Sequence, residues 1–401
     1  MNAMGFAWRS LVRQPARASL GILGVAAVGA LLFDMLMLSQ GLIVSMRDLL
    51  DQGGWDIRVS AGDLPRGGPR LPDALSSAQA IAALPSVRAA MVVRGVDARL
   101  ERATSSPLFA SVQGAAILTS GGDADPPGMP WTILRGREAD GASEVVVNEA
   151  TAAMLSLAPG SPLTLRASCV SDQEALPATR LLVVGIASFP FASANEYSVG
   201  GTLAALTAAC GGNADDEADL ILVASTGDAA ATTQAIRTVV PGVSAATNDE
   251  VLGRLQETGF TYFRQISSVL TTVTVSFAVL LITVLLTVSV NQRLGEVAAL
   301  RALGFSRARV VKDVLSESAL IVGAGGLFSL PLGLLLAEAL DRILKAMPGI
   351  PVALHFFVFE PQALAVHGGL LAATALVAAL YPVRVVARLP IAATLRDEVN
   401  G

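Results

Sequence analysis

Cys169 and Cys210 have the plainest covalent chemistry in this sequence, and they are its only two cysteines. They lie about 40 residues apart and form no C-x-x-C pair, so their spacing excludes a zinc cluster, and we expect no metal site. In an oxidising compartment the two thiols can form a disulfide that closes the loop between them. Two unrelated buried thiols are the alternative, which the sequence leaves open.

Asp34 is a carboxylate placed inside a long apolar run. A charge inside a membrane span costs a few kcal/mol, so its presence is by default a sign of function. A polar contact to a neighbouring helix or to a dimer interface would also explain it. The other apolar runs offer no Lys or Arg as a partner. The sequence therefore marks Asp34 as an intramembrane charge whose role is open.

Motifs typical of enzymes are missing from the sequence. The run 304–308 matches a nucleophile elbow at all but one position, but it lies in a loop far from His355 and His367, the only two histidines. No H-E-x-x-H zinc motif and no G-x-x-x-x-G-K-[ST] phosphate loop occurs. We therefore expect that the chain is not an enzyme and binds no cofactor of its own.

The composition is that of a membrane protein. Hydrophobic residues make up 53% of the 401 residues and charged residues 15%, whereas soluble domains carry roughly 25% charged residues. This apolar excess excludes a disordered chain. The net charge is -5 and the basic residues form no dense stripe interleaved with aromatics, so nucleic acid is not an expected partner.

Four apolar runs are long enough to cross a bilayer, which takes roughly 20 residues of helix. They show no alternating strand pattern, and backbone amides cannot stay unpaired in lipid, so each run is predicted to be a helix. A cleaved signal peptide is an alternative for the first run, but that run is longer than the roughly 7 to 15 apolar residues of such a signal. The four predicted spans are 18–43, 266–290, 318–340 and 364–383.

The distribution of Arg and Lys orients these spans, because basic residues favour the cytoplasmic side. They concentrate in the segments 1–17, 291–317 and 384–401. Both termini and the second connection are therefore predicted to be cytoplasmic. The segment 44–265, with 24 acidic and 15 basic residues, and the short loop 341–363 are predicted to lie outside.

The outer segment 44–265 reads as a mixed α/β domain. We expect two α/β halves interrupted by a β-rich module at about 131–186, because turn-rich gaps flank strand and helix patterns. Its ends, 45–52 and 249–265, are compatible with helices that continue the first two spans as a stalk. The predicted strands are 55–59, 144–148, 162–166, 181–186 and 220–224, with either a strand pair or one long strand at 88–100. The predicted helices are 75–84, 149–157 and 229–239.

Small residues recur every four positions in the third span, at Gly325, Ser329 and Gly333. This spacing lays them along one helix face, which favours close packing against another helix. A substrate groove is the alternative. Pro331 between them is predicted to kink the helix.

The stretch 290–336 closely resembles the FtsX-like permease domain of bacterial ABC transporters, whose core reads Glu-x-x-x-Leu-Arg-Ala-Leu-Gly. Glu296 and the run 300–304 match that core, and 381–398 resembles the family's closing segment. The runs 135–149 and 183–186 resemble the periplasmic domain of MacB-type and LolC/LolE-type permeases. The resemblance implies a four-helix membrane protein with a large periplasmic α/β domain between its first and second helices.

The resemblance also implies partners. Without a phosphate loop here, ATP and Mg would be bound by a separate ABC ATPase subunit, which a coupling segment would contact; the alternative for that segment is a basic loop that only sets topology. A second permease copy or a paralogue, membrane lipid, and a periplasmic membrane-fusion protein or lipoprotein carrier are the other expected partners. The coupling residues implied are Arg293, Glu296, Leu300, Arg301, Gly304, Arg307 and Arg309.

The function implied is that of a permease subunit in a bacterial inner membrane. ATP hydrolysis on the partner would drive movements of the periplasmic domain that export or release a lipoprotein, lipid, peptide or drug. The alternative is an FtsX-like signalling permease that regulates a periplasmic enzyme and transports nothing. An ion-coupled transporter would need internal repeats and several buried charges, which the sequence lacks.

Overall fold

The protein is described by a computed structural model, in which two compact units are present. A helical unit contains residues 1–42, 260–342 and 356–401, and an outer unit contains residues 43–259 and 343–355. The structure describes residues 9, 12–13, 15–62, 69–101, 107–119, 127–169, 178–211, 216–258, 261–291, 306–359 and 361–387.

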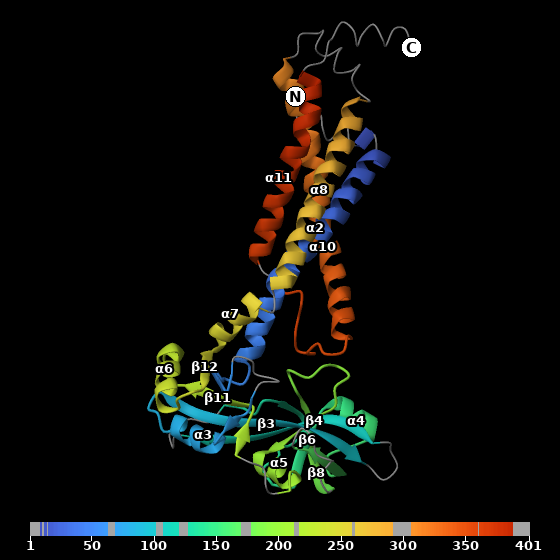
Figure 1. Ribbon diagram of the computed structural model, residues 1–401. Coiled ribbons are helices and arrows are strands. Elements are labelled where there is room, and N and C mark those ends of the chain that lie inside the picture. The colour runs from blue at the N-terminus through green and yellow to red at the C-terminus, as the bar shows by residue number, and fades with distance from the viewer. Residues whose placement is uncertain are drawn as a thin grey trace. The chain divides into compact units, whose positions relative to one another are not determined.

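Four long helices build the helical unit (Figure 1). Among the described residues, four helices are long and apolar enough to cross a membrane, which confirms the prediction of four long apolar helices. The helices extend beyond the apolar runs, because the polar residues that flank these runs are also helical. They are α2 (Pro15–Asp51), α8 (Thr261–Asn291), α10 (Arg307–Lys345) and α11 (Pro361–Ala387).

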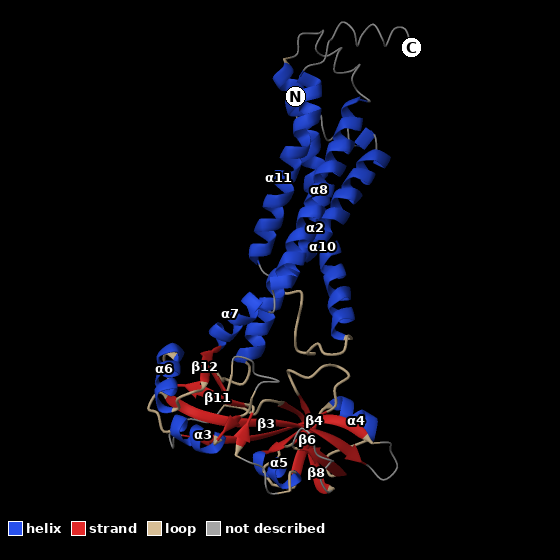
Figure 2. Cartoon of the chain, viewed as in Figure 1, coloured by secondary structure: helices blue, strands red, loops and turns tan. Residues whose placement is uncertain are grey.

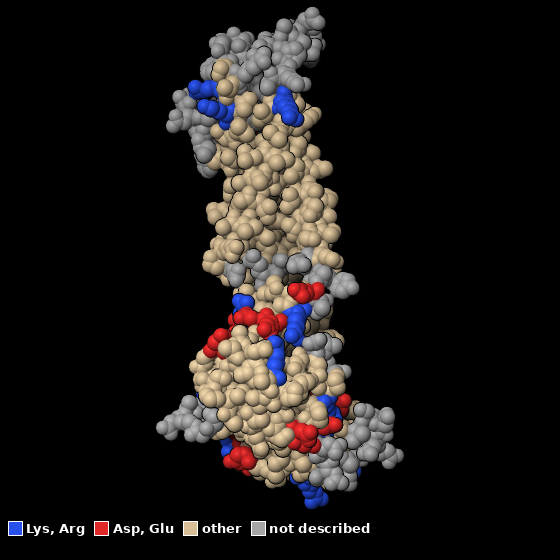
Figure 3. Space-filling model, turned by 60° about the vertical axis from the view of Figure 1, so that its left-hand side comes forward, with Lys and Arg blue, Asp and Glu red and all other residues tan. Residues whose placement is uncertain are grey.

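All four helices contribute to one apolar cluster in this unit. Val25 and Leu32 of α2 meet Ile282 and Leu286 of α8, together with side chains of α10 and α11. Large apolar side chains also cover the outside, and Phe277 is 66% exposed. On the face shown in Figure 3, the described residues of the helical unit form a surface that is uncharged along most of its length, with Lys and Arg at one end. This is the surface expected of helices in lipid.

The outer unit is built on one ten-stranded sheet, ordered β12-β1-β11-β3-β4-β9-β6-β8-β5, with β7 paired to β3 and β8 (Figure 2). The strands β2 (Leu71–Pro72) and β10 (Glu217–Ala218) form a separate pair. The strands of the sheet are β1 (Ile57–Ser60), β3 (Val87–Glu101), β4 (Leu108–Thr119), β5 (Thr132–Gly136), β6 (Glu144–Val147), β7 (Pro162–Ser168), β8 (Thr179–Ser188), β9 (Ser198–Thr202), β11 (Leu220–Ser225) and β12 (Ser244–Thr247).

In the described part of the outer unit there are five shorter helices, and polar side chains begin three of them. Asn148, Thr202 and Asp228 each accept a hydrogen bond from a backbone N–H of the first turn, which satisfies a donor that the helix cannot pair itself. The helices are α3 (Ala74–Ala82), α4 (Glu149–Leu155), α5 (Leu203–Ala209), α6 (Ala229–Val239) and α7 (Asn248–Thr258).

The long strand β3 serves three apolar clusters, because successive side chains point to opposite faces of a sheet. On one face, Ala90 and Val92 enter one cluster, and Val96, Ala98 and Leu100 enter a second. On the other face, Ala89 and Met91 pack in a third cluster with both tryptophans of this unit, Trp55 and Trp131. Through its two faces, β3 therefore connects the three apolar clusters of the outer unit.

The limits predicted for an inserted β-rich module, about 131–186, do not match the cluster that this region forms. Val145, Leu163 and Val183 lie inside those limits, but their cluster also takes Val112 from β4 and Leu206 from α5. The sheet is continuous because β3 and β4 pair over twelve positions, from Ala89 with Thr119 to Leu100 with Leu108.

Candidate functional site

Most of the predicted coupling residues lie outside the part of the chain that the structure describes. Two of them belong to the first turn of α10, where the backbone N–H of Arg309 donates to the carbonyl of Ser306 at 3.0 Å and the Arg309 side chain is exposed. The last residues of the segment 291–317 therefore belong to the same helix as the third span, α10. Arg307 is the other residue in α10, and the five outside the described residues are Arg293, Glu296, Leu300, Arg301 and Gly304.

The small residues of α10 face α2 at matching four-residue steps. A Cβ atom on Gly325 would lie 2.6 Å from the Val25 Cβ, and one on Gly29 would lie 2.8 Å from the Ser329 Cβ. A Cβ atom on Gly333 would lie 3.0 Å from the Phe33 ring. The two helices thus approach along a line where larger side chains would not fit, the arrangement that small residues permit between membrane helices.

Replacing Gly325 with leucine is expected to weaken the α2–α10 contact by about 2 kcal/mol, because the new side chain must displace Val25 and the nearby backbone. The measurement is the thermal stability of the detergent-solubilised chain, monitored by size-exclusion chromatography after heating.

Gly323→Leu is the matched control for this substitution. It makes the same change two residues away on α10, where nothing lies within 4 Å of the added Cβ atom. Equal losses of stability in the two variants would contradict the packing role of Gly325.

Ser329 also joins α10 to α11. Its hydroxyl donates to the carbonyl of Gly326 at 2.7 Å, so its oxygen is left to accept from Nε2–H of His367 at 2.9 Å. The His367 ring lies 5.3 Å from that of Phe33 on α2. Three helices therefore meet around one buried hydroxyl. This role of His367 has no local signal in the sequence, because its partner is 38 residues away.

Asp34 lies within the helical unit and is fully buried. Among the described residues, neither of its carboxylate oxygens has a hydrogen-bond partner. The polar contact to a neighbouring helix that the sequence left open is thus not seen in the described part of the chain. A functional role for Asp34 stays a prediction.

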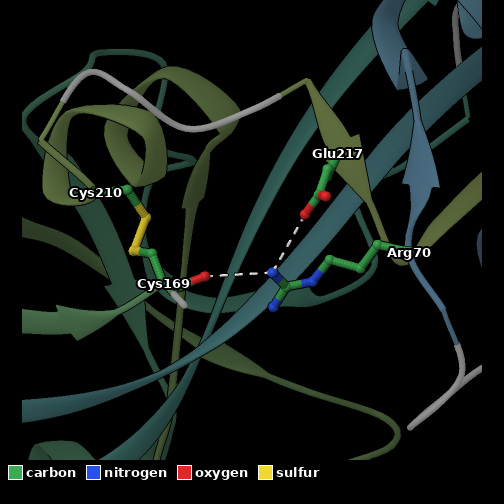
Figure 4. Close-up of a disulfide and its surroundings, with 4 residues drawn as sticks. All are labelled: Arg70, Cys169, Cys210 and Glu217. Carbon is green, nitrogen blue, oxygen red and sulfur yellow. Dashed lines mark hydrogen bonds and ion pairs between the residues drawn. A yellow bond between two sulfur atoms is a disulfide. The ribbon is translucent and has the colours of Figure 1, made fainter. Parts of the chain in front are cut away.

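Cys169 and Cys210 form a disulfide in the outer unit, with their Cα atoms 5.8 Å apart (Figure 4). Cys169 follows β7 directly and Cys210 caps α5, and both lie in the apolar cluster formed around β3, β4 and β8. The bond therefore fastens a helix end to a strand end across a separation of 41 residues.

Arg70 extends this anchor to the short strand β10. Its guanidinium donates to the backbone carbonyl of Cys169 at 3.3 Å and lies 3.5 Å from the carboxylate of Glu217 (Figure 4). It also pairs with Asp219 at 3.4 Å, and that carboxylate accepts the backbone N–H of Gly95 at 2.7 Å. One side chain thus holds the strand ends β2, β7 and β10 beside β3.

Asn248 joins the end of α2 to the start of α7. Its amide donates to the carbonyls of Leu50 and Trp55 at 3.1 and 2.8 Å and to the Asp51 carboxylate at 2.8 Å. Its own oxygen accepts from the Arg58 guanidinium at 3.1 Å. Burial lowers the pKa of Arg58 to about 10, and the nearby negative charge of Asp51 offsets part of this decrease. At pH 7 this guanidinium is still charged and holds its hydrogen bonds.

The sequence matches two protein families that together account for both units. Residues 268–391 match the FtsX-like permease C-terminal family, and residues 19–252 match the MacB-like periplasmic core domain family, over more than half of the chain. The chain belongs to the FtsX/MacB-type permeases. It is thus a multi-pass membrane protein with an extracytoplasmic domain, from a family of ABC transporter permeases without an ATPase domain. Such a permease implies an ATPase partner.

Three solved structures are similar to parts of this permease. The periplasmic region of MacB from Actinobacillus actinomycetemcomitans is 13% identical, covering 52% of this chain and 95% of that one, with a TM-score of 0.37. The extracellular domain of the ABC-type transporter YknZ from Gram-positive bacteria is 9% identical, covering 48% and 98%, with a TM-score of 0.33. A domain of a permease from Porphyromonas gingivalis is 11% identical, covering 48% and 86%, with a TM-score of 0.29. No curated protein matches the chain.

The sequence does not reveal the polar residues that join distant segments of this permease. Arg70 contacts residues 99 and 149 positions away, and the amide of Asn248 reaches Leu50 over 198 positions. No local pattern records such contacts. The one available signal was the polar, helix-compatible character of the two stalk segments, 45–52 and 249–265.

Proposed function

We propose that this permease uses ATP hydrolysis on a separate ABC ATPase subunit to move its outer domain, and thereby exports or releases a lipoprotein, lipid, peptide or drug. It would work as a homodimer or heterodimer in a bacterial inner membrane, with both termini in the cytoplasm. A periplasmic membrane-fusion protein or lipoprotein carrier would receive the substrate. ATP and Mg would be held by the partner subunit.

The observation that carries this proposal is the FtsX-like match over 268–391. It includes the whole basic connection between the second and third spans, where the family resemblance puts the coupling residues Glu296 and Arg301. A basic loop alone would set the topology without this order of residues. The match therefore favours a contact with an ATPase.

The shape of the helix that leads to the outer domain supports the proposed transmission of motion. α2 is continuous from Pro15 to Asp51, and its last residues accept hydrogen bonds from Asn248 at the start of α7. Because each helical residue is held by its own backbone hydrogen bonds, an unbroken helix transmits displacement along its axis. Movement of the α2 end would then be passed to both β1 and α7.

The test of this proposal is co-purification of the tagged full chain in detergent, followed by an ATPase assay. We expect an ABC ATPase subunit to be recovered with the wild type. Glu296→Ala combined with Arg301→Ala should lose that subunit or reduce the ATPase activity measured with the permease by about tenfold, the effect of losing a charge-assisted contact at an interface.

Arg384→Ala is the matched control for the coupling variant. It removes a basic side chain that is exposed on α11 and lies outside the coupling segment. We expect it to behave as the wild type. A folded wild-type chain that recovers no ATPase, or a double variant as active as Arg384→Ala, would overturn the coupling role.

A further inference from the structure

The outer unit contains a cavity of about 750 Å³ over one face of the strands β3 and β4, beneath α7 and the end of α2. Cavities of roughly 300 to 1,000 Å³ are typical of sites for small molecules. No function that was predicted from the sequence involves this cavity. The lining of this cavity changes from apolar to polar along the strands, and this change decides which kind of ligand the cavity can hold.

The floor of the cavity is a single face of the sheet. Val93, Gly95 and Asp97 alternate along β3 and therefore point to the same side. Gln113 and Ser111 of β4 stand opposite Gly95 and Asp97, and Ser168 of β7 is also opposite Asp97. Gly95 has no side chain, which leaves the middle of the floor open.

One end of this floor is apolar. Val93 lies beside Leu220 of β11, and the same face continues into the cluster that buries Met91, Trp131 and Phe189. Above it, α7 contributes Val251 and Leu255. Met46 and Leu50 of α2 contribute a similar pair, and pairs spaced by four point to one helix face. This end offers apolar walls to an aliphatic chain.

The other end is polar, and the face becomes more exposed toward it. Met91 is fully buried, Val93 and Gly95 are half-buried, and Asp97 is exposed. Asp97, Ser111 and Ser168 also line a second cavity of about 610 Å³. The row formed by these three side chains is therefore the place where the two hollows meet.

The charges around the first cavity are not equally available to a ligand. Arg70 and Asp219 are paired with each other, and Arg58 donates to Asn248 and to the Leu50 carbonyl. Asp97 has no hydrogen bond or ion pair with any described residue. The one uncommitted charge on this lining, within the described part of the chain, is therefore a carboxylate flanked by two serine hydroxyls.

We propose that this cavity binds a linear amphiphile with an aliphatic chain and an ammonium head. The chain occupies the apolar end between β11 and α7, and the head donates to the Asp97 carboxylate, with Ser111 and Ser168 beside it. A carboxylate head would be repelled at the same place, because like charges at close range disfavour each other. This inference rests on the proposed function only in that it names a substrate class for the permease.

The test is calorimetric titration of the full chain in nanodiscs, without any ATPase subunit, with octylamine as the probe. Octanol and octanoate have the same chain with a neutral and an anionic head. We expect saturable binding of octylamine beyond the partitioning into empty nanodiscs, and binding at least tenfold weaker for octanoate. Asp97→Asn should weaken octylamine binding about tenfold and leave octanol unchanged, because one charge-assisted hydrogen bond is lost.

Asp48→Asn is the matched control, since it neutralises an exposed carboxylate on α2 that does not line the cavity. Equal binding of octylamine and octanoate, equal effects of Asp97→Asn and Asp48→Asn, or partitioning alone would each overturn the proposal. Shortening the probe to hexylamine is a second measurement that needs no variant: loss of two methylenes should weaken binding about tenfold if the chain is buried. No ATPase is present in the titration. A negative titration would therefore not affect the coupling test, and a negative coupling test would not affect the interpretation of the titration.

Discussion

Removal of the disulfide between Cys169 and Cys210 is expected to lower the free energy of unfolding of the outer domain by about 4 kcal/mol. The bond closes a loop with a sequence separation of 41 residues, and the loss of loop entropy in the unfolded chain grows with that length. Both sulfur-bearing residues are buried in the cluster around β3, so replacing each with alanine removes the link with a small change in volume. The measurement is denaturant unfolding of the full chain followed by tryptophan fluorescence, because Trp55 and Trp131 are both buried in the outer unit.

Reduction of the wild type provides the control for this double substitution. Treatment with a phosphine reductant should shift the wild-type unfolding midpoint toward that of the variant and leave the variant where it was. If the reductant moves both proteins equally, or if the double variant unfolds at the wild-type midpoint, the disulfide contributes no such stability. In the variant, the backbone carbonyl of residue 169 should no longer be held where it accepts a hydrogen bond from Arg70.

Periodicity in the sequence was sufficient to predict the long helices and six of the twelve strands of the described residues, but not helix α5. The four spans were found from long apolar runs, and helix α6 occupies the predicted residues 229–239. The run 88–100, predicted as a strand pair or one long strand, is the single strand β3, at Val87–Glu101. These elements have strong local signals because one face, or the whole surface, of each is apolar.

Strand β4 shows why other parts of the outer domain escaped prediction. It contains Gly114 and Ala116, and small residues are poor indicators of a strand by propensity. Gly114 is nonetheless required there, because a Cβ atom would lie 2.7 Å from the Leu206 Cβ of α5. The packing of Leu206, 92 positions further along the chain, selects the residue at this position, and no local pattern contains that information.

The polar residues of the candidate site likewise lack a local signal in the sequence. Asp97 stands out only because β7 and β4 bring Ser168 and Ser111 to either side of it. His367 stands out only because α10 places Ser329 against its ring. The sequence could predict which segments are helices and strands, but the chemistry of these sites arises from pairings between segments that are distant along the chain.

Asn248→Ala is expected to destabilise the outer domain by about 3 kcal/mol. The substitution leaves the carbonyls of Leu50 and Trp55 without this buried donor and removes an acceptor from the Arg58 guanidinium, and each lost partner costs a desolvation penalty. Because these contacts join the end of α2 to the start of α7, we also expect the variant to reduce substrate-stimulated ATPase activity of the assembled transporter. The measurements are denaturant unfolding followed by tryptophan fluorescence and the ATPase assay with the partner subunit.

Asn248→Asp keeps an acceptor for Arg58 but has no N–H to donate to the carbonyls of Leu50 and Trp55, and it places a second carboxylate against that of Asp51. We expect it to be less stable than the wild type and no more stable than Asn248→Ala. Gln234→Ala on the exposed face of α6 is the control, and it should leave both stability and activity unchanged. If Asn248→Ala were as stable as Gln234→Ala, the junction between α2 and α7 would have to be held by other contacts. If it were unstable yet fully stimulated by substrate, motion would reach the outer domain by another route, and the last turn of α2 would serve only as an anchor.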